Sequence, residues 1–305
     1  NKKNGWWAIL RANVLDKGSV FEDIALKNKN RNLMGKWNYT LYSESIAQRF
    51  MGNGNPEAGV KALNDIRAEV DNTGLTHEFS EYIYHKHNVD RMKLKERFDI
   101  ENKPVFGYNI TAEASEDIVK LYENAHPEFM DYAQDVYNYQ NYLRQQLVDN
   151  GVISQETADL WSEMYPHYVP IRRINTRGNN INVALDTGRT GVNAPIKKAT
   201  GGNTDILPLF DTMAMRTLQT YKATAKNSFG VELKNTLGTT IDKGSTNVDE
   251  VIESIDSQEE LLQKGKNGEK PTFTVFENGE RVTFEITEDM YDAIKPISEG
   301  LRTEL

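Results

Sequence analysis

The residues best suited to chemistry lie in one short stretch, residues 161–173, which reads WSEMYPHYVPIRR and is called the joint below. His167 stands between Tyr165 and Tyr168, and its imidazole is a candidate general base if this stretch lines a cleft. Arg172 and Arg173 follow directly, and guanidinium groups bind phosphate oxygens through paired hydrogen bonds. The alternative is that one of them pairs with an acid on the helix 127–149 and the other is exposed. The joint therefore predicts either a phosphate-binding site or an acid–base site.

A basic segment follows the joint. Residues 172–226 hold nine basic and three acidic side chains, a net charge of +6, so the other 250 residues together carry −15. Within it, the backbone amides of Gly201 and Gly202 could cradle a phosphate where a helix begins, although such a glycine pair is also an ordinary turn before a helix. We expect 172–198 to be an arm that binds nucleic acid or a neighbouring domain.

The candidate binding residues of the joint and the arm are Tyr165, His167, Tyr168, Arg172, Arg173, Arg177, Arg189, Lys197, Lys198, Gly201 and Gly202.

Other sites are excluded or not indicated. The chain has no cysteine, which excludes disulfides, cysteine-bound zinc and cysteine nucleophiles. No phosphate-binding P-loop, dinucleotide fingerprint, zinc-protease motif or serine elbow occurs. We therefore predict no catalytic residue, no metal and no cofactor. The net charge of −9 argues against general attraction to nucleic acid or to membranes, and no apolar run is long enough to span a bilayer.

Two prolines are expected to position the joint by ending the helix before it. Pro166 and Pro170 lack an N–H and disfavour helix in the residues before them, so a helix from Ser154 should stop here and 165–171 should run extended. We take the joint as a hinge between two halves of one architecture.

Hydrophobic spacing predicts helices around the joint. Ser19 is expected to cap the first, and Thr111 or Ser115 a later one. His85 and His87 point in different directions on their helix, so we expect them to be solvated or capping residues. The predicted helices cover 20–29, 31–51, 76–96, 116–125, 127–149, 206–238 and 249–263. On the helix 127–149 a mainly apolar stripe with 4-3-4-3-4 spacing is expected to be buried, namely Phe129, Ala133, Val136, Gln140, Leu143 and Leu147.

From residue 272 on, the spacing of hydrophobic residues changes from the helical period to a period of two residues, which is typical of a strand. Residues 272–286, TFTVFENGERVTFEI, alternate about Asn278-Gly279, which predicts a hairpin with Val275 opposite Val282. Its apolar face must lie on a helix, because an isolated hairpin is marginal in water. The predicted fold is mainly α, an elongated multi-helix array with a long basic loop and one C-terminal β-hairpin (272–286). Its expected parts are 1–55, 56–173, 174–240 and 241–305.

Three strings carry a family resemblance: YVPIRR at 168–173, PIKKATGG at 195–202, and a long helix containing Ala-Lys-Asn at 225–227. Over about residues 75–295 the chain resembles the large polyvalent protein-associated domains of phages and conjugative elements. The resemblance implies a mostly helical module within a much longer protein, beside DNA-processing domains, without an agreed reaction.

These observations leave three functions open. The first is a non-catalytic accessory module associated with transferred DNA, the second an enzyme with a site near 165–173, and the third a scaffold or internal virion component. We expect a piece of a longer protein, located in the bacterial cytoplasm or packaged with phage or element DNA, with nucleic acid through 172–226 or neighbouring domains as partners and no membrane partner.

Overall fold

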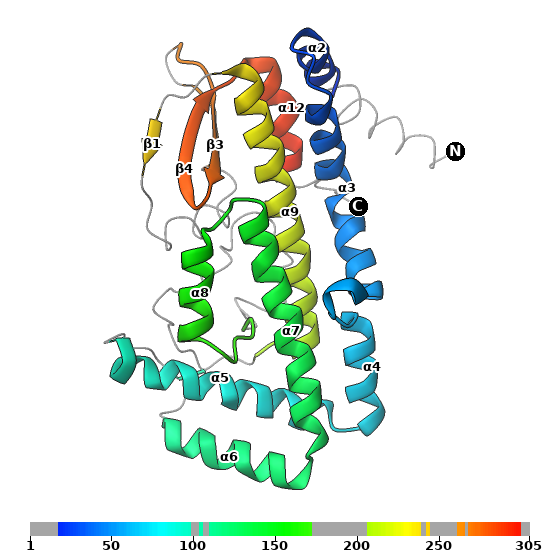
Figure 1. Cartoon of the computed structure of the whole chain (residues 1–305), viewed down its shortest axis with the longest axis vertical. Coiled ribbons are helices and arrows are strands. Elements are labelled where there is room, and N and C mark those ends of the chain that lie inside the picture. Colours follow the sequence, from blue (N-terminus) through cyan, green and yellow to red (C-terminus); the bar gives the residue numbers. More distant parts are fainter. Residues whose placement is uncertain are drawn as a thin grey trace, which may run out of the picture.

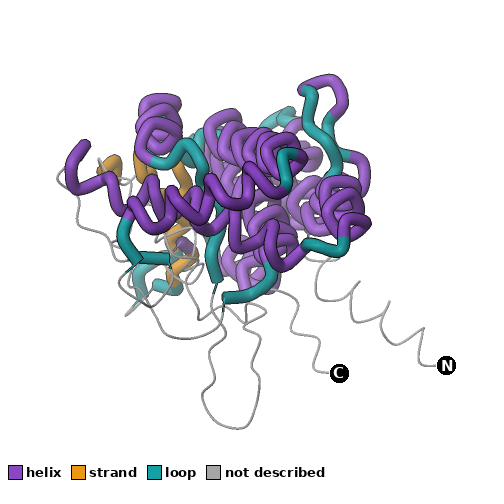
Figure 2. Tube along the Cα trace, turned by 90° about the horizontal axis from the view of Figure 1, so that it is seen from below, coloured by secondary structure: helices purple, strands orange, loops and turns teal. Residues whose placement is uncertain are grey.

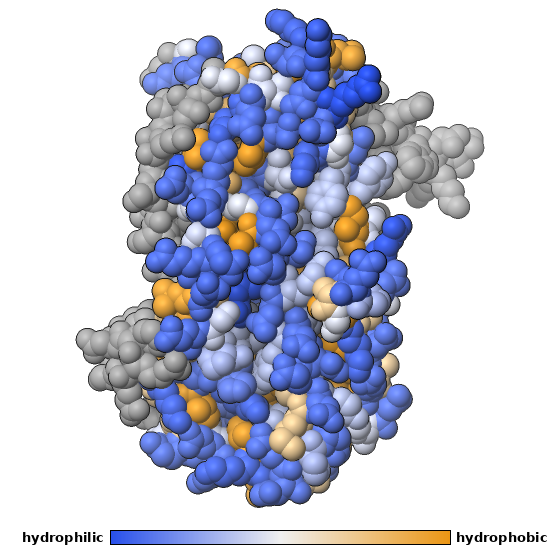
Figure 3. All heavy atoms as spheres, viewed as in Figure 1, coloured by the Kyte–Doolittle hydropathy of each residue, from blue (hydrophilic) through white to orange (hydrophobic). Residues whose placement is uncertain are grey.

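The computed structural model describes residues 18–98, 104–105, 110–172, 206–238, 242–244, 261–265 and 268–299. These residues form an elongated, mainly helical body with a small sheet at one end, which confirms the predicted fold class (Figure 1). No helix in the described ranges combines the length and apolarity that crossing a membrane requires. The face in Figure 3 is largely hydrophilic, with apolar side chains scattered over it.

Helix α9 (Leu209–Leu237) runs along the centre of the body, beside α3 (Arg31–Asn53) and α7 (Glu128–Asp149) (Figure 1). In the view from below, α5 and α6 lie across the end of these long helices and the strands lie to one side (Figure 2). The remaining helices are α2 (Ser19–Lys27), the 3-10 helix η3 (Pro56–Ala58), α4 (Leu63–Thr73), α5 (Thr76–Phe98), α6 (Ala112–Ala125), α8 (Gln155–Met164) and α12 (Glu288–Glu299).

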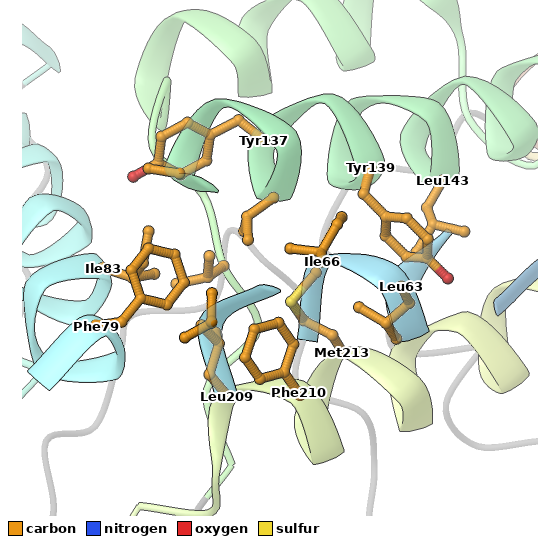
Figure 4. Packing of buried hydrophobic residues seen from close by; sticks show 14 of the residues in the cluster. Leu63, Ile66, Phe79, Ile83, Tyr137, Tyr139, Leu143, Leu209, Phe210 and Met213 are labelled. Carbon is orange, nitrogen blue, oxygen red and sulfur yellow. The ribbon is translucent and has the colours of Figure 1, made fainter. Parts of the chain in front are cut away.

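The core at the α5 end is built where α4, α5, α7 and α9 meet. Phe79 of α5, Ile66 of α4 and Met213 of α9 are fully buried there, and Tyr139 of α7 lies beside them (Figure 4). The Tyr139 hydroxyl is 2.9 Å from Thr217 Oγ1, so its polar atom is satisfied inside the core. The predicted stripe of α7 is confirmed, because all of its members are buried, namely Phe129, Ala133, Val136, Gln140, Leu143 and Leu147.

The predicted hairpin is confirmed with its register. Strand β3 (Thr272–Glu277) pairs antiparallel with β4 (Glu280–Glu285), and Val275 lies opposite Val282. The apolar face packs on α9, as expected. A Cβ at Gly230 of α9 would lie 2.4 Å from Val275 Cγ1, so only glycine allows the helix this close to the strand.

The sheet is larger than predicted. Two short strands flank the hairpin, β1 (Asp242–Gly244) and β2 (Leu262–Gln263), giving the order β1-β4-β3-β2. The predicted helix 249–263 is therefore wrong at its end, where Leu262 pairs with Phe273; residues 245–260 lie outside the described residues. A two-residue strand has too few positions to show an alternating pattern.

The other face of the hairpin is also covered, because the chain between α7 and α8 lies on it. Phe276 is 2% exposed and packs with Ile153 and Trp161. The N–H of Gly279 donates to Gly151 O at 3.1 Å, and Asn227 of α9 donates to the carbonyls of Asn150 and Phe276 at 2.8 and 2.9 Å. These contacts fix α8 against α9 and the sheet.

The helix ends test the capping residues that were predicted from the sequence. Thr111 caps α6 by accepting from the N–H of Ala114 at 3.2 Å, and Ser154 caps α8 by accepting from Thr157 at 3.1 Å. Ser115, the alternative cap, is instead buried inside α6. The cap predicted at Ser19 is wrong: α2 begins at Ser19, and Gly18 holds the cap position without a side-chain hydrogen bond.

Candidate anion-binding site

The joint begins where Pro166 ends α8, as predicted, but its first residues, 165–168, form a turn and do not run extended. Helix α8 ends at Met164, directly before Tyr165-Pro166. The N–H of Tyr168 then donates to Tyr165 O at 3.2 Å, which closes a turn over Pro166 and His167. The end of the joint is tied to the start of α9, because the Leu207 N–H donates to Arg172 O at 2.8 Å.

His167 is oriented by a buried carboxylate that the sequence pattern did not reveal. Asp90 of α5 accepts from the backbone N–H of His167 at 2.7 Å, and its other oxygen lies 3.1 Å from His167 Nδ1. The Asp90 side chain is 8% exposed and that of His167 is 38% exposed. The His167 ring also stands edge-on to Tyr137 of α7, with centroids 5.3 Å apart. Asp90 therefore holds one ring nitrogen and pins the joint to α5.

The prediction of exposed histidines on α5 is wrong, because both His85 and His87 are buried. Burial lowers the pKa of His85, against a smaller opposing effect of Glu81, and its Nδ1 lies 3.1 Å from Ser115 Oγ. Burial, reinforced by the charges of Arg91 and His167, holds the pKa of His87 well below its ordinary value.

The His87 ring packs between the two tyrosines of the joint, with centroids 5.6 Å from Tyr165 and 5.7 Å from Tyr168. Because its neutral form is favoured there, His87 acts as an uncharged packing residue beneath the joint.

A pocket lies beside the joint, between α7, α8 and α9. Its cavity measures about 20 Å³, enough to hold one water or one oxygen of a larger ligand. We call it the arginine pocket. Its lining residues are Gln140, Leu143 and Arg144 of α7, Trp161 of α8, Tyr165 and Tyr168 of the joint, and Arg216 of α9.

The two arginines of this pocket are close enough to affect each other. Burial lowers the pKa of Arg144; the phenol of Tyr168 opposes this, and the positive charge of Arg216 adds to it. Arg144 donates to Ser162 Oγ of α8. Among the described residues, no carboxylate lines the pocket and neither arginine forms a salt bridge. Two like charges thus face one cavity without a counter-ion from this part of the chain.

Two further hydrogen-bond donors at the pocket lack partners. Gln140 is 3% exposed and Trp161 is 4% exposed. Gln140 Nε2 and Trp161 Nε1 have no hydrogen-bond acceptor among the described residues. Both donor atoms are fully buried, and a buried donor left without an acceptor costs about 1–3 kcal/mol.

The predicted binding residues divide into three groups. Tyr165 and Tyr168 line the arginine pocket, and His167 is held by Asp90. Arg172 Nη1 lies 3.6 Å from the sulfur of Met215, the residue before Arg216. The others lie outside the described residues, namely Arg173, Arg177, Arg189, Lys197, Lys198, Gly201 and Gly202.

Two of the described basic residues of 172–226 lie away from the arginine pocket. Lys222 forms an ion pair with Glu44 of α3 at 3.2 Å. Lys226 is buried between α9 and the sheet, beside a second cavity of about 20 Å³. Arg216 alone of the three faces the arginine pocket.

Comparison of the chain with known protein families, with curated proteins and with solved structures finds no significant match. The resemblance to polyvalent protein-associated domains therefore stays a prediction. In the described residues, no group of three His, Asp or Glu side chains is arranged to hold a metal ion.

Sequence reasoning missed Gln140, Arg144, Trp161 and Asp90 as site residues. One signal was present: Gln140 is a polar residue within the apolar stripe of α7, and a buried amide needs a partner. Arg144 and Asp90 gave no such signal, because their neighbours in space, Arg216 and His167, are distant in the sequence.

Proposed function

We propose that this chain is a non-catalytic binding module of a large phage or mobile-element protein, and that it binds phosphate groups of nucleic acid at the joint. The observation that carries the proposal is the arginine pocket, where Arg144 and Arg216 meet without a carboxylate among the lining residues. Guanidinium groups match the oxygens of phosphate, and a pair lacking protein counter-ions is suited to an external anion.

Aromatic rings support nucleic acid over a simple anion. Tyr168 lines the pocket and is partly exposed, so a base next to a bound phosphate could stack on its ring. The formal net charge of −9 means that binding must be local, because the molecule as a whole repels a polyanion. We therefore expect weak, salt-sensitive binding centred on the pocket.

The test is fluorescence anisotropy with a labelled single-stranded oligonucleotide at low ionic strength. We expect saturable binding by the wild type and, for Arg216→Met, an affinity lower by about tenfold or more, since a charged hydrogen bond contributes about 1.5–3 kcal/mol. Arg49→Met is the matched control, because it removes the same charge from an exposed site on α3. Equal affinities of Arg216→Met and Arg49→Met would argue against the proposal.

The alternative of an enzyme with a site near 165–173 is supported by one observation. Asp90 holds Nδ1 of His167 as a carboxylate holds the imidazole of a general base. If this alternative is right, the wild type cleaves a chromogenic phosphodiester and His167→Gln does not. Cleavage that is absent, or equal in both proteins, rules out this role of His167.

A further inference from the structure

The arginine pocket has two guanidinium groups and no carboxylate among its described lining residues. Arg144 and Arg216 have only N–H donors and stay charged at any relevant pH. Gln140 and Trp161 also line the pocket, but their donor nitrogens are fully buried and are not counted as donors to a ligand. Ser162 Oγ is an acceptor for Arg144 alone. The missing component is therefore one with several acceptor oxygens and a negative charge.

The two guanidinium groups belong to different elements. Arg144 comes from α7 and Arg216 from α9, so a ligand in the pocket lies between side chains of two helices. A planar carboxylate offers two oxygens along one edge, whereas a phosphate group presents oxygens in tetrahedral directions. A water in the pocket would leave the repulsion between the two arginines unrelieved.

The walls of the pocket keep this geometry in place. Trp161 is held in a buried cluster with Phe276 and Ile153, and Gln140 belongs to the buried stripe of α7. Tyr165 is 5% exposed and is packed against His87. The walls of the pocket are therefore rigid, which lowers the entropy lost when an anion binds.

We propose that the arginine pocket is a subsite for a single phosphate group, one oxygen of which enters the cavity and is bound by the guanidinium groups of Arg144 and Arg216. This inference rests on the proposed function only for the source of the phosphate, which is a nucleic-acid backbone there. The subsite itself predicts binding of inorganic phosphate, so the two proposals can fail separately.

The experiment is a titration of the ¹⁵N-labelled chain with inorganic phosphate, followed by the indole N–H signals in two-dimensional NMR. We expect the Trp161 signal, assigned with Trp161→Phe, to shift saturably because the bound charge lies beside the Trp161 ring, which lines the pocket. Trp37, buried among Phe21 and Phe229 in the core near the sheet, is the internal control and should not move. Potassium chloride at matched ionic strength should leave both signals in place.

Variants separate the subsite from a general effect of phosphate. Arg216→Met should weaken phosphate binding by about tenfold or more, and Arg49→Met should change it by less than about twofold. A Trp161 signal that does not move, or that moves equally in chloride, means that water alone fills the pocket and overturns the inference. Because this comparison uses the wild type, it holds even if Arg216→Met folds poorly.

A parallel titration with the oligonucleotide shows whether the bound phosphate group comes from nucleic acid or from free phosphate. If the oligonucleotide and inorganic phosphate both shift Trp161, both proposals stand. If phosphate shifts it and the oligonucleotide does not bind, the subsite stands and the nucleic-acid function fails. If the oligonucleotide binds without moving Trp161 and phosphate has no effect, the subsite is wrong and nucleic acid binds the chain at a place other than this pocket.

Discussion

At the scale of single residues, Lys226 is the clearest case of a buried charge without compensation. It is 6% exposed, and its Nζ has no hydrogen-bond partner among the described residues. The nearest favourable contact is the ring of Phe273, whose centroid lies 6.0 Å from Nζ. Burial lowers the pKa of Lys226 from 10.5 to about 7. Folding therefore disfavours the charged amine.

We expect Lys226→Met to stabilise the chain, and the gain to depend on pH. Between about pH 7 and 10.5 the unfolded lysine binds more protons than the folded one, so wild-type stability rises with pH across this window. The penalty that methionine removes is full below about pH 7 and is lost above about pH 10.5. At pH 7 or below the gain should be on the order of 2–5 kcal/mol.

The measurement is the free energy of unfolding in urea, taken for both proteins at several pH values. Lys222→Met is the control on the same helix, because Lys222 is exposed and paired with Glu44, and its effect should stay within about 0.5 kcal/mol. A gain that is the same at pH 6 and pH 11, or a loss of stability at pH 6, contradicts the account of Lys226.

Residue-scale predictions from sequence failed where burial depends on distant partners. His85 and His87 were expected at the surface, but Ser115 of α6 and the tyrosines of the joint cover them. Nothing in the spacing of α5 reveals those partners. The exposed and buried sides of a helix with so many polar residues cannot be separated by its own pattern.

At the scale of elements, the contact between α9 and the hairpin determines how the two ends of the body are joined. Gly230 lets β3 approach α9, and Phe229 and Leu233 beside it lie in the same buried cluster as Val275. Since interiors are close-packed, an added methyl group there cannot be absorbed without moving the strand.

Gly230→Ala should therefore lower the free energy of unfolding by about 1–3 kcal/mol. Its Cβ would lie 2.4 Å from Val275 Cγ1 and 2.8 Å from Phe273 Cε1. Gly35→Ala in α3 is the matched control, because a Cβ added there would meet no neighbouring atom within 4 Å and the helix should gain about 0.5–1 kcal/mol. Urea unfolding of both variants gives the comparison; a Gly230→Ala protein as stable as wild type would show that β3 does not pack this closely.

Elements were the best-predicted level of this chain. The stripe of α7 and the alternation of 272–286 are periodic over enough residues to define a buried face, and both are confirmed. The joint was predicted in part: Pro166 ends α8, but the turn it begins was not foreseen, because proline restricts its neighbour without choosing between a turn and an extended chain. Strands β1 and β2 are too short for any pattern.

At the scale of the whole molecule, an acidic chain places a small positive site where three helices and the joint meet. Charge counting along the sequence drew attention to 172–226, and Arg216 belongs to that segment. It could not identify Arg144, whose segment is not basic, nor exclude Lys222 and Lys226, which face α3 and the sheet. Tertiary packing brings Arg144 and Arg216 to one pocket, and the charge pattern of the sequence indicates only the segment that contains Arg216.

The most direct test of the phosphate site is the salt dependence of oligonucleotide binding. For single strands, each neutralised phosphate adds about 0.7 to the slope of log affinity against log salt. We predict that the double variant Arg144→Met/Arg216→Met has a slope lower than that of wild type by roughly one such contact, while Arg49→Met keeps the wild-type slope. A double variant with the wild-type slope and affinity would contradict the account, because the phosphate contacts would then lie elsewhere.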